Sequence, residues 1–287
     1  MRVIKKCFYG KGHDRQYSSI YLPNTNREDL AFWPILIWFH QGTYKEGGDR
    51  SEVLEIVNRF VPAGYIVIAA EYWCPKTIPI TWNDRLTAMN RAVRDMARVI
   101  DSVYYYTDAL GGDPQYIFVG SESWGAMYLN FLILADAGDT GPCLQGIRFT
   151  TPIIGLISYW GGCPGQDGIL IANSKGTGYS YAQGREPPDI LLMTNKYDST
   201  IDTKASVYVE LTYVDAGKVP NINMWAYQVS FPPLNPGDPW GDAHRLWNES
   251  TARALGRMFN WTEAKLATYP GIMQQQLPAH FVPAWPP

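Results

Sequence analysis

Ser123 is the residue whose sequence context most suggests covalent chemistry. It follows an apolar run of strand type at residues 116–120 and precedes a long apolar stretch, residues 127–134, that fits a buried helix. A serine at the sharp turn between a strand and a helix, a nucleophile elbow, can act as a nucleophile. Such turns prefer glycine two residues before and after the serine. Here Gly125 fills the second position, whereas Ser121 replaces the first. By itself the pattern also fits a serine that only caps a helix.

A serine hydroxyl is a weak nucleophile at neutral pH, so it needs a general base and a carboxylate that orients the base. His244 follows the last predicted strand, which is where the chain order serine, acid, histidine puts the base. Asp198 lies just after an earlier predicted strand and is the expected acid, with Asp202 as the alternative. Asp242 is too close to His244 in sequence to orient it easily.

The elements that must position these residues alternate along the chain. Continuous apolar runs predict buried strands at residues 34–39, 65–70, 116–120, 152–160 and 190–194. Amphipathic patterns predict helices at residues 49–64, 84–104, 204–216 and 246–259. In the second of these helices, Arg91, Asp95 and Arg98 lie opposite the apolar stripe. An N-terminal hairpin, residues 4–9 with 16–22, and a strand at residues 222–229 complete the pattern. This alternation predicts an α/β fold with a mostly parallel sheet and helices on both faces.

In an open parallel sheet, ligands bind at the carboxyl ends of the strands. Four predicted loops at that edge carry polar residues able to do chemistry: residues 40–48, 121–126, 195–199 and 231–244. The first of these loops begins with His40 and contains several glycines, so its backbone amides could face an oxyanion. We expect His40 to hold that loop rather than to act as the base.

The length of 287 residues fits one large domain, which we place at residues 1–260. Within it, residues 161–188 are rich in glycine and polar side chains and lack periodicity, so we expect a loop or a small cap-like insertion there. Residues 261–287 are predicted to form a Pro-rich C-terminal arm. This arm is a candidate contact for a homodimer.

Composition excludes several classes of function. The net charge is −3 and no run of like charges stands out, which argues against nucleic acid or an anionic membrane as partner. The apolar runs are too short to span a membrane, and the N-terminus has no secretion signal, so we expect a cytoplasmic protein, or a secreted one if a leader was removed. The four cysteines lack metal-ligand spacing, although Cys143 and Cys163 could form a disulfide.

Six short motifs follow the order of segments in a known family: HQGTY at 40–44, AEYWCP at 70–75, GGDP at 111–114, SESWGA at 121–126, TNKYD at 194–198 and DAHRLW at 242–247. They are similar to an HGGG oxyanion loop, D-Y-R-L-x-P, GGDP, a GESAGA or GDSAGG elbow, an H-G-x-x-D acid loop and a G-x-x-H-x-F/W base loop. The chain therefore resembles carboxylesterases and hormone-sensitive-lipase-like esterases over roughly residues 9–259. The resemblance implies the α/β-hydrolase fold.

The resemblance also implies a role for each matching residue. Ser123 would be the nucleophile, His244 the general base and then acid, and Asp198 the residue that orients it. The oxyanion amides would be those of Gly42, Thr43 and Trp124. Glu122 would be a structural carboxylate beneath the elbow. No metal and no cofactor is implied.

The chain departs from the family pattern near the expected site. Gln41 and Thr43 replace glycines of the oxyanion loop, and Gln41 could supply a donor of its own. Trp124 puts a large ring beside the nucleophile, where it could wall or restrict the acyl pocket. The aromatic residues expected to line a substrate pocket together with Gln41 are Tyr44, Trp73, Trp160 and Tyr197.

We therefore expect a serine hydrolase that cleaves small-molecule or sugar-linked carboxylic esters through an acyl-enzyme. The departures at Gln41, Thr43 and Ser121 motivate an alternative, a non-catalytic binding protein of the same fold. A serine peptidase of this fold is a weaker alternative, because the chain lacks room for the propeller domain that such peptidases usually carry.

Overall fold

The computed structural model describes residues 1–11, 16–24, 33–41, 51–77, 81–134, 151–159, 161, 165–166, 169–170, 187–195, 206–207, 209–210, 213–214, 217–220, 224–229 and 241–268. Of the predicted loops, residues 42–48, 196–199 and 231–240 lie outside these ranges, as do Cys143 and Cys163.

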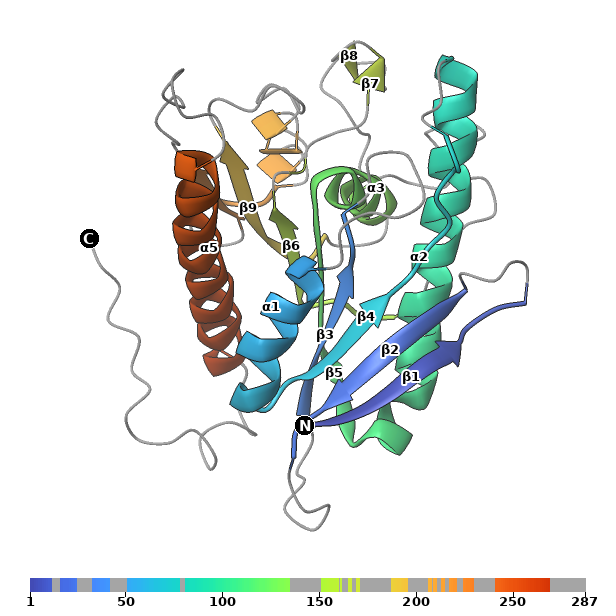
Figure 1. The fold of residues 1–287 in the computed structure, drawn as a ribbon, viewed down its shortest axis with the longest axis vertical. Helices are drawn as coiled ribbons and strands as arrows, with labels where there is room; N and C mark the ends of the chain where they lie inside the picture. Colours follow the sequence, from blue (N-terminus) through green and yellow to red (C-terminus); the bar gives the residue numbers. More distant parts are fainter. Residues whose placement is uncertain are drawn as a thin grey trace.

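An eight-stranded sheet with the order β1-β2-β4-β3-β5-β6-β9-β10 forms the centre of the molecule (Figure 1). The strands are β1 (Arg2–Phe8), β2 (Tyr17–Leu22), β3 (Trp33–Phe39), β4 (Ile66–Ala70), β5 (Gly112–Glu122), β6 (Gly155–Tyr159), β9 (Asp189–Asn195) and β10 (Met224–Val229). The pairs β1–β2 and β2–β4 are antiparallel, and the other neighbours are parallel. The predicted mostly parallel sheet is confirmed, with the predicted N-terminal hairpin at one edge.

The named helices of the described chain are α1 (Ser51–Phe60), the short 3₁₀ helix η2 (Val61–Ala63), α2 (Trp82–Leu110), α3 (Ser123–Leu134) and α5 (Gly241–Ala267). The prediction of a last helix over residues 246–259 is wrong at both ends. The helix continues past residue 260 because Trp261 and Leu266 are buried against the sheet and the neighbouring helices. Residues 261–267, predicted to begin the C-terminal arm, are therefore part of α5. No helix in the described ranges is long and apolar enough to cross a membrane.

The two faces of the sheet are covered by different helices. Successive side chains of a strand point to opposite faces, and β3 is apolar along its length. Ile35 and Ile37 belong to a buried cluster that includes residues of α2 and α3. Leu36 and Trp38 belong to a second buried cluster, with residues of α1 and α5. Helices thus cover both faces, as predicted, and the parallel strands between them are buried on both sides (Figure 1).

The predicted insertion at residues 161–188 contains a short antiparallel hairpin, β7 (Gly165–Gln166) with β8 (Ile169–Leu170), which is separate from the main sheet. Figure 1 shows this hairpin at the end of the molecule toward which β6 and β9 point.

The predicted helix at residues 204–216 is helical at the positions described, residues 206–207, 209–210 and 213–214. Gly217 ends it with a φ of 76°, and the amides of Gly217 and Lys218 donate to the carbonyls of Val214 and Tyr213. This is the Schellman pattern that favours glycine after a helix.

Candidate active site

Ser123 lies at a sharp turn between β5, which ends at Glu122, and α3, which begins at Ser123 itself. Its φ is 55°, and it is the single non-glycine residue with a positive φ within the described ranges. The left-handed conformation costs an L-residue roughly 1–2 kcal/mol, so the surrounding structure must enforce it. Ser123 is partly exposed, whereas the residues before it are buried. A strained, partly exposed serine at the end of a central strand is the backbone geometry that a nucleophile elbow requires.

Gly125 shows why the turn needs a glycine at this position. A methyl group there would lie 2.5 Å from the carbonyl oxygen of His40 and closer still to Oγ of Ser121. Ser121, which replaces the other elbow glycine, is fully buried, and its Oγ donates to the carbonyl oxygen of Phe39 at 2.7 Å. The substitution at Ser121 therefore ties the end of β5 to the end of β3 rather than disturbing the turn.

His40 follows β3 and is 2% exposed. Its Nδ1 lies 2.6 Å from the carbonyl oxygen of Gln41, and because a carbonyl only accepts, Nδ1 is the donor. The opposite nitrogen, Nε2, lies 3.7 Å from Oε2 of Glu71, at the exit of β4. The imidazole therefore contacts residues that follow both β3 and β4. These contacts support the structural role predicted for His40.

His244 lies in the first turn of α5, whereas the sequence predicted it in the loop before the helix. The last turn of α5 is anchored at the amino end of β9 by an ion pair between Lys265 and Asp189. A helix of 27 residues is about 40 Å long, whereas the seven residues of β9 span about 20 Å. The helix therefore brings the backbone of His244 to the carboxyl end of the sheet, where the turn at Ser123 lies.

Several predicted site residues lie outside the described part of the chain: Gly42, Thr43, Tyr44, Trp160, Tyr197, Asp198 and Asp202. The expected acid and the oxyanion loop therefore remain predictions, and so does the role of Gly42 as a donor. Glu122, predicted to be structural, ends β5 and is buried.

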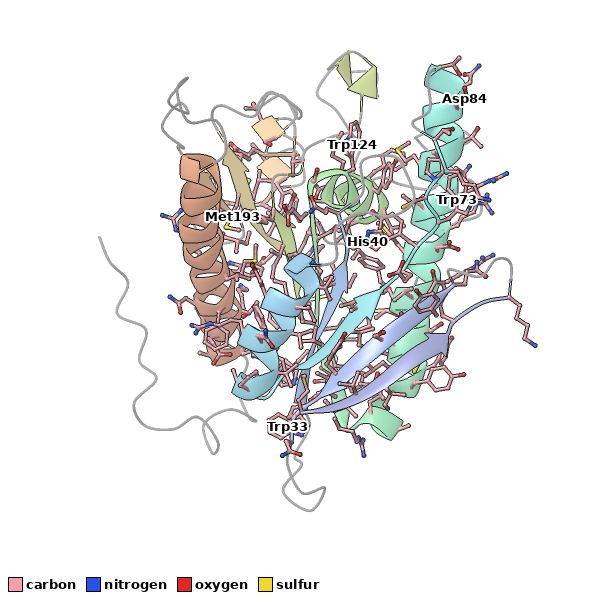
Figure 2. All side chains as sticks on the ribbon, in the orientation of Figure 1. Trp33, His40, Trp73, Asp84, Trp124 and Met193 are labelled. Atoms are coloured by element: carbon pink, nitrogen blue, oxygen red, sulfur yellow. The ribbon has the colours of Figure 1, made fainter. Side chains whose placement is uncertain are left out.

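Figure 2 shows His40, Trp73 and Trp124 near the exits of β3, β4 and β5. Trp124 is partly buried and packs against Met127 of α3. The ring of Trp73 lies 4.9 Å from the guanidinium of Arg91 on α2, in a cation–π contact. Trp73 therefore packs against α2, and its predicted place in a substrate pocket stays a prediction.

Asp95 is a buried residue that the sequence placed opposite the apolar stripe of its helix. It is 2% exposed, because the N-terminal hairpin and the exit of β4 cover it. Its carboxylate accepts hydrogen bonds from Nε2 of Gln16 at 2.7 Å and from the amide of Trp73 at 3.0 Å. These partners lie 79 and 22 residues away in sequence, so helical periodicity carries no signal for them. Asp95 fixes the backbone that leaves β4 beside the site.

The sheet order, the helices on both faces and the strained serine after β5 define an α/β-hydrolase fold. No protein-family model matches the chain, and no curated protein matches it in sequence. Within the described ranges, no cluster of three or more histidine, cysteine, aspartate or glutamate side chains could hold a metal ion.

Solved structures with the same fold include several esterases. Native esterase Est2 of the planctomycete Thermogutta terrifontis aligns with a TM-score of 0.61 and 16% identity, over 93% of this chain and 95% of that one. The same enzyme phosphonylated by sarin aligns with a TM-score of 0.58 and 14% identity, over 87% and 92%. A truncated carbohydrate esterase from gut microbiota gives 0.58 and 13%, over 80% and 88%.

Proposed function

We propose that the protein is a serine hydrolase that cleaves carboxylic esters through an acyl-enzyme. The single observation that carries this proposal is the left-handed backbone of Ser123 at the end of a central parallel strand, in an α/β-hydrolase fold. A helix cap requires no such conformation, because capping residues normally have extended backbone. The esterases with the same fold support the choice of ester as substrate.

In the proposed mechanism, Oγ of Ser123 attacks the ester carbonyl while His244 removes the hydroxyl proton and Asp198 orients the imidazole. The amides of Gly42, Thr43 and Trp124 stabilise the oxyanion of the tetrahedral intermediate. His244 then gives its proton to the departing alcohol. Water, activated by the same histidine, attacks the acyl-enzyme and releases the acid. The reaction requires no metal and no cofactor.

The substrate that we propose is a small-molecule or sugar-linked ester. The Thermogutta enzyme phosphonylated by sarin supports a nucleophile that reacts with electrophilic acyl and phosphonyl groups. The carbohydrate esterase among the similar structures supports acylated sugars as one substrate class. Trp124 follows the nucleophile directly, and we expect its ring to limit the size of the acyl group.

Hydrolysis of p-nitrophenyl acetate and butyrate tests the proposal. We expect turnover by the wild type and nearly complete loss in both Ser123→Ala and His244→Ala, because triad residues act as a unit and their losses do not add. A folded wild type that releases no p-nitrophenol would instead support a non-catalytic binding protein. Turnover that survives in Ser123→Ala would assign the chemistry to another residue.

A further inference from the structure

Tyr72 lies two residues after β4 and joins the exits of β4 and β3. Its side chain is completely buried, and its hydroxyl donates to the carbonyl oxygen of His40 at 2.9 Å. The phenol ring also stacks on the imidazole of His40, with ring centroids 4.5 Å apart and planes inclined by 15°. Both the backbone and the side chain of His40 therefore depend on Tyr72 for their position.

The same hydroxyl lies against the first turn of α3. A methyl group on Gly125 would lie 3.1 Å from Oη of Tyr72 and 2.5 Å from the carbonyl oxygen of His40. Gly125 is only two residues after Ser123. The hydrogen bond between Tyr72 and His40 thus packs directly against the backbone of the turn that holds the serine.

A second hydrogen bond fixes the neighbouring carbonyl. Oγ of Ser121, two residues before Ser123, donates to the carbonyl oxygen of Phe39. Consecutive carbonyls at the end of β3, those of Phe39 and His40, are therefore held by hydroxyls from β5 and from the exit of β4. This double attachment fixes the direction in which the chain leaves β3.

We propose that Tyr72 is a positioning residue for the oxyanion hole, and this inference rests on the proposed function. The proposed donors Gly42 and Thr43 follow His40 by two and three residues in sequence, whereas the third proposed donor, the amide of Trp124, belongs to α3. The proposed mechanism requires all three donors to face one oxygen atom. By holding the carbonyl of His40 against the first turn of α3, the hydroxyl of Tyr72 sets the spacing of the two elements.

Packing alone is the competing explanation, because the ring of Tyr72 also makes edge contacts with Phe39 and Tyr128 at centroid distances of 6.3 and 6.4 Å. Tyr72→Phe separates the two roles, since it keeps the ring and removes only the hydroxyl. Tyr213→Phe is a matched control. Tyr213 is equally buried, and its hydroxyl donates at the same distance of 2.9 Å to the carbonyl of Pro188, just before the amino end of β9.

The experiment measures kcat and KM for p-nitrophenyl butyrate, binding of an alkylboronic acid that mimics the tetrahedral intermediate, and unfolding by urea. We expect Tyr72→Phe to lower kcat roughly 10-fold with KM unchanged, less than the roughly 10²–10³-fold loss that follows removal of an oxyanion donor. Binding of the boronic acid should weaken by a similar factor. Tyr213→Phe should keep the wild-type kcat, and both variants should lose similar stability because each removes the hydrogen bond of one buried tyrosine side chain.

Three results would overturn the positioning role while leaving the proposed function intact. These are a wild-type kcat in Tyr72→Phe, an equal loss of kcat in Tyr213→Phe, or a Tyr72→Phe protein that fails to fold, since the hydroxyl would then be needed for the fold itself. A wild type without Ser123-dependent turnover would contradict the proposed function, and the positioning role with it.

Discussion

Ser123 and Gly125 meet two different structural requirements of the turn after β5. Ser123 takes the left-handed backbone that presents its hydroxyl, and Gly125 lets the turn pack against the end of β3. Ser121 adds a buried hydrogen bond to Phe39. This bond removes one reason to regard the chain as a non-catalytic relative, because the missing glycine is replaced by a residue that supports the same turn.

Gly125→Ala should both destabilise the protein and abolish ester hydrolysis. The added methyl group would meet Oγ of Ser121 and the carbonyl of His40, and overpacking of this kind typically costs about 1–3 kcal/mol. Gly256→Ala in α5 is the control, because a methyl group there meets nothing within 4 Å. The control should be neutral or more stable by about 0.5–1 kcal/mol. Urea unfolding and the ester assay measure both effects, and an active, fully stable Gly125→Ala would contradict the described packing.

Single residues were predictable from the sequence where the signal was local. The turn at Ser123 was predictable, because a strand, a break and a helix follow each other within a short stretch of sequence. The burial of Asp95 was not, because the groups that cover it come from distant segments. The role of Tyr72 also depends on a contact between two strand exits, 32 residues apart.

At the scale of elements, α5 carries a buried carboxylate, that of Glu263, on the face that packs against α1. Glu263 accepts a hydrogen bond from the hydroxyl of Tyr65 at 2.6 Å. Burial raises the pKa of Glu263, and this effect outweighs the hydrogen bond from Tyr65 and the charge of Arg59, which lower it. Burial also raises the pKa of Tyr65, and the neighbouring Glu263 adds to that increase.

Glu263→Gln should change how stability depends on pH. Because the pKa of Glu263 is raised in the folded state, its contribution to stability is fully present below the pKa of an unfolded glutamate and is lost as pH rises through the folded value. Glutamine keeps an acceptor for Tyr65 without a charge. The free energy of unfolding of the variant, relative to wild type, should therefore increase from about pH 4 to about pH 8. Urea unfolding across this range measures it, and a constant or decreasing difference would contradict the assignment.

The ends of elements were less predictable than their existence. Helix α5 extends beyond the predicted residues 246–259 on both sides. At its C-terminal end, tertiary burial of Trp261 and Leu266 continues the helix past residue 259. The strands, in contrast, fall close to their predicted positions, since a run buried on both faces must be apolar throughout.

At the scale of the whole molecule, the fold is shared with esterases at 13–16% identity. Such distant sequences can keep one fold because alternation of buried strands and amphipathic helices is satisfied by many apolar residues. The same alternation of strands and helices allowed the six short motifs to be placed in order along the chain. The predicted acid, Asp198, and the predicted oxyanion donors Gly42 and Thr43 lie outside the described residues, and spacing in sequence alone does not fix their geometry.

The proposed hydrolysis depends most on Ser123 being a nucleophile that the fold activates. Labelling with a fluorophosphonate, followed by mass spectrometry of the digested protein, tests this directly. We expect one phosphonyl group on the peptide that contains Ser123, and no label on Ser123→Ala or on wild type unfolded in urea. Equal labelling of wild type and Ser123→Ala, or no labelling of a folded wild type, would contradict it.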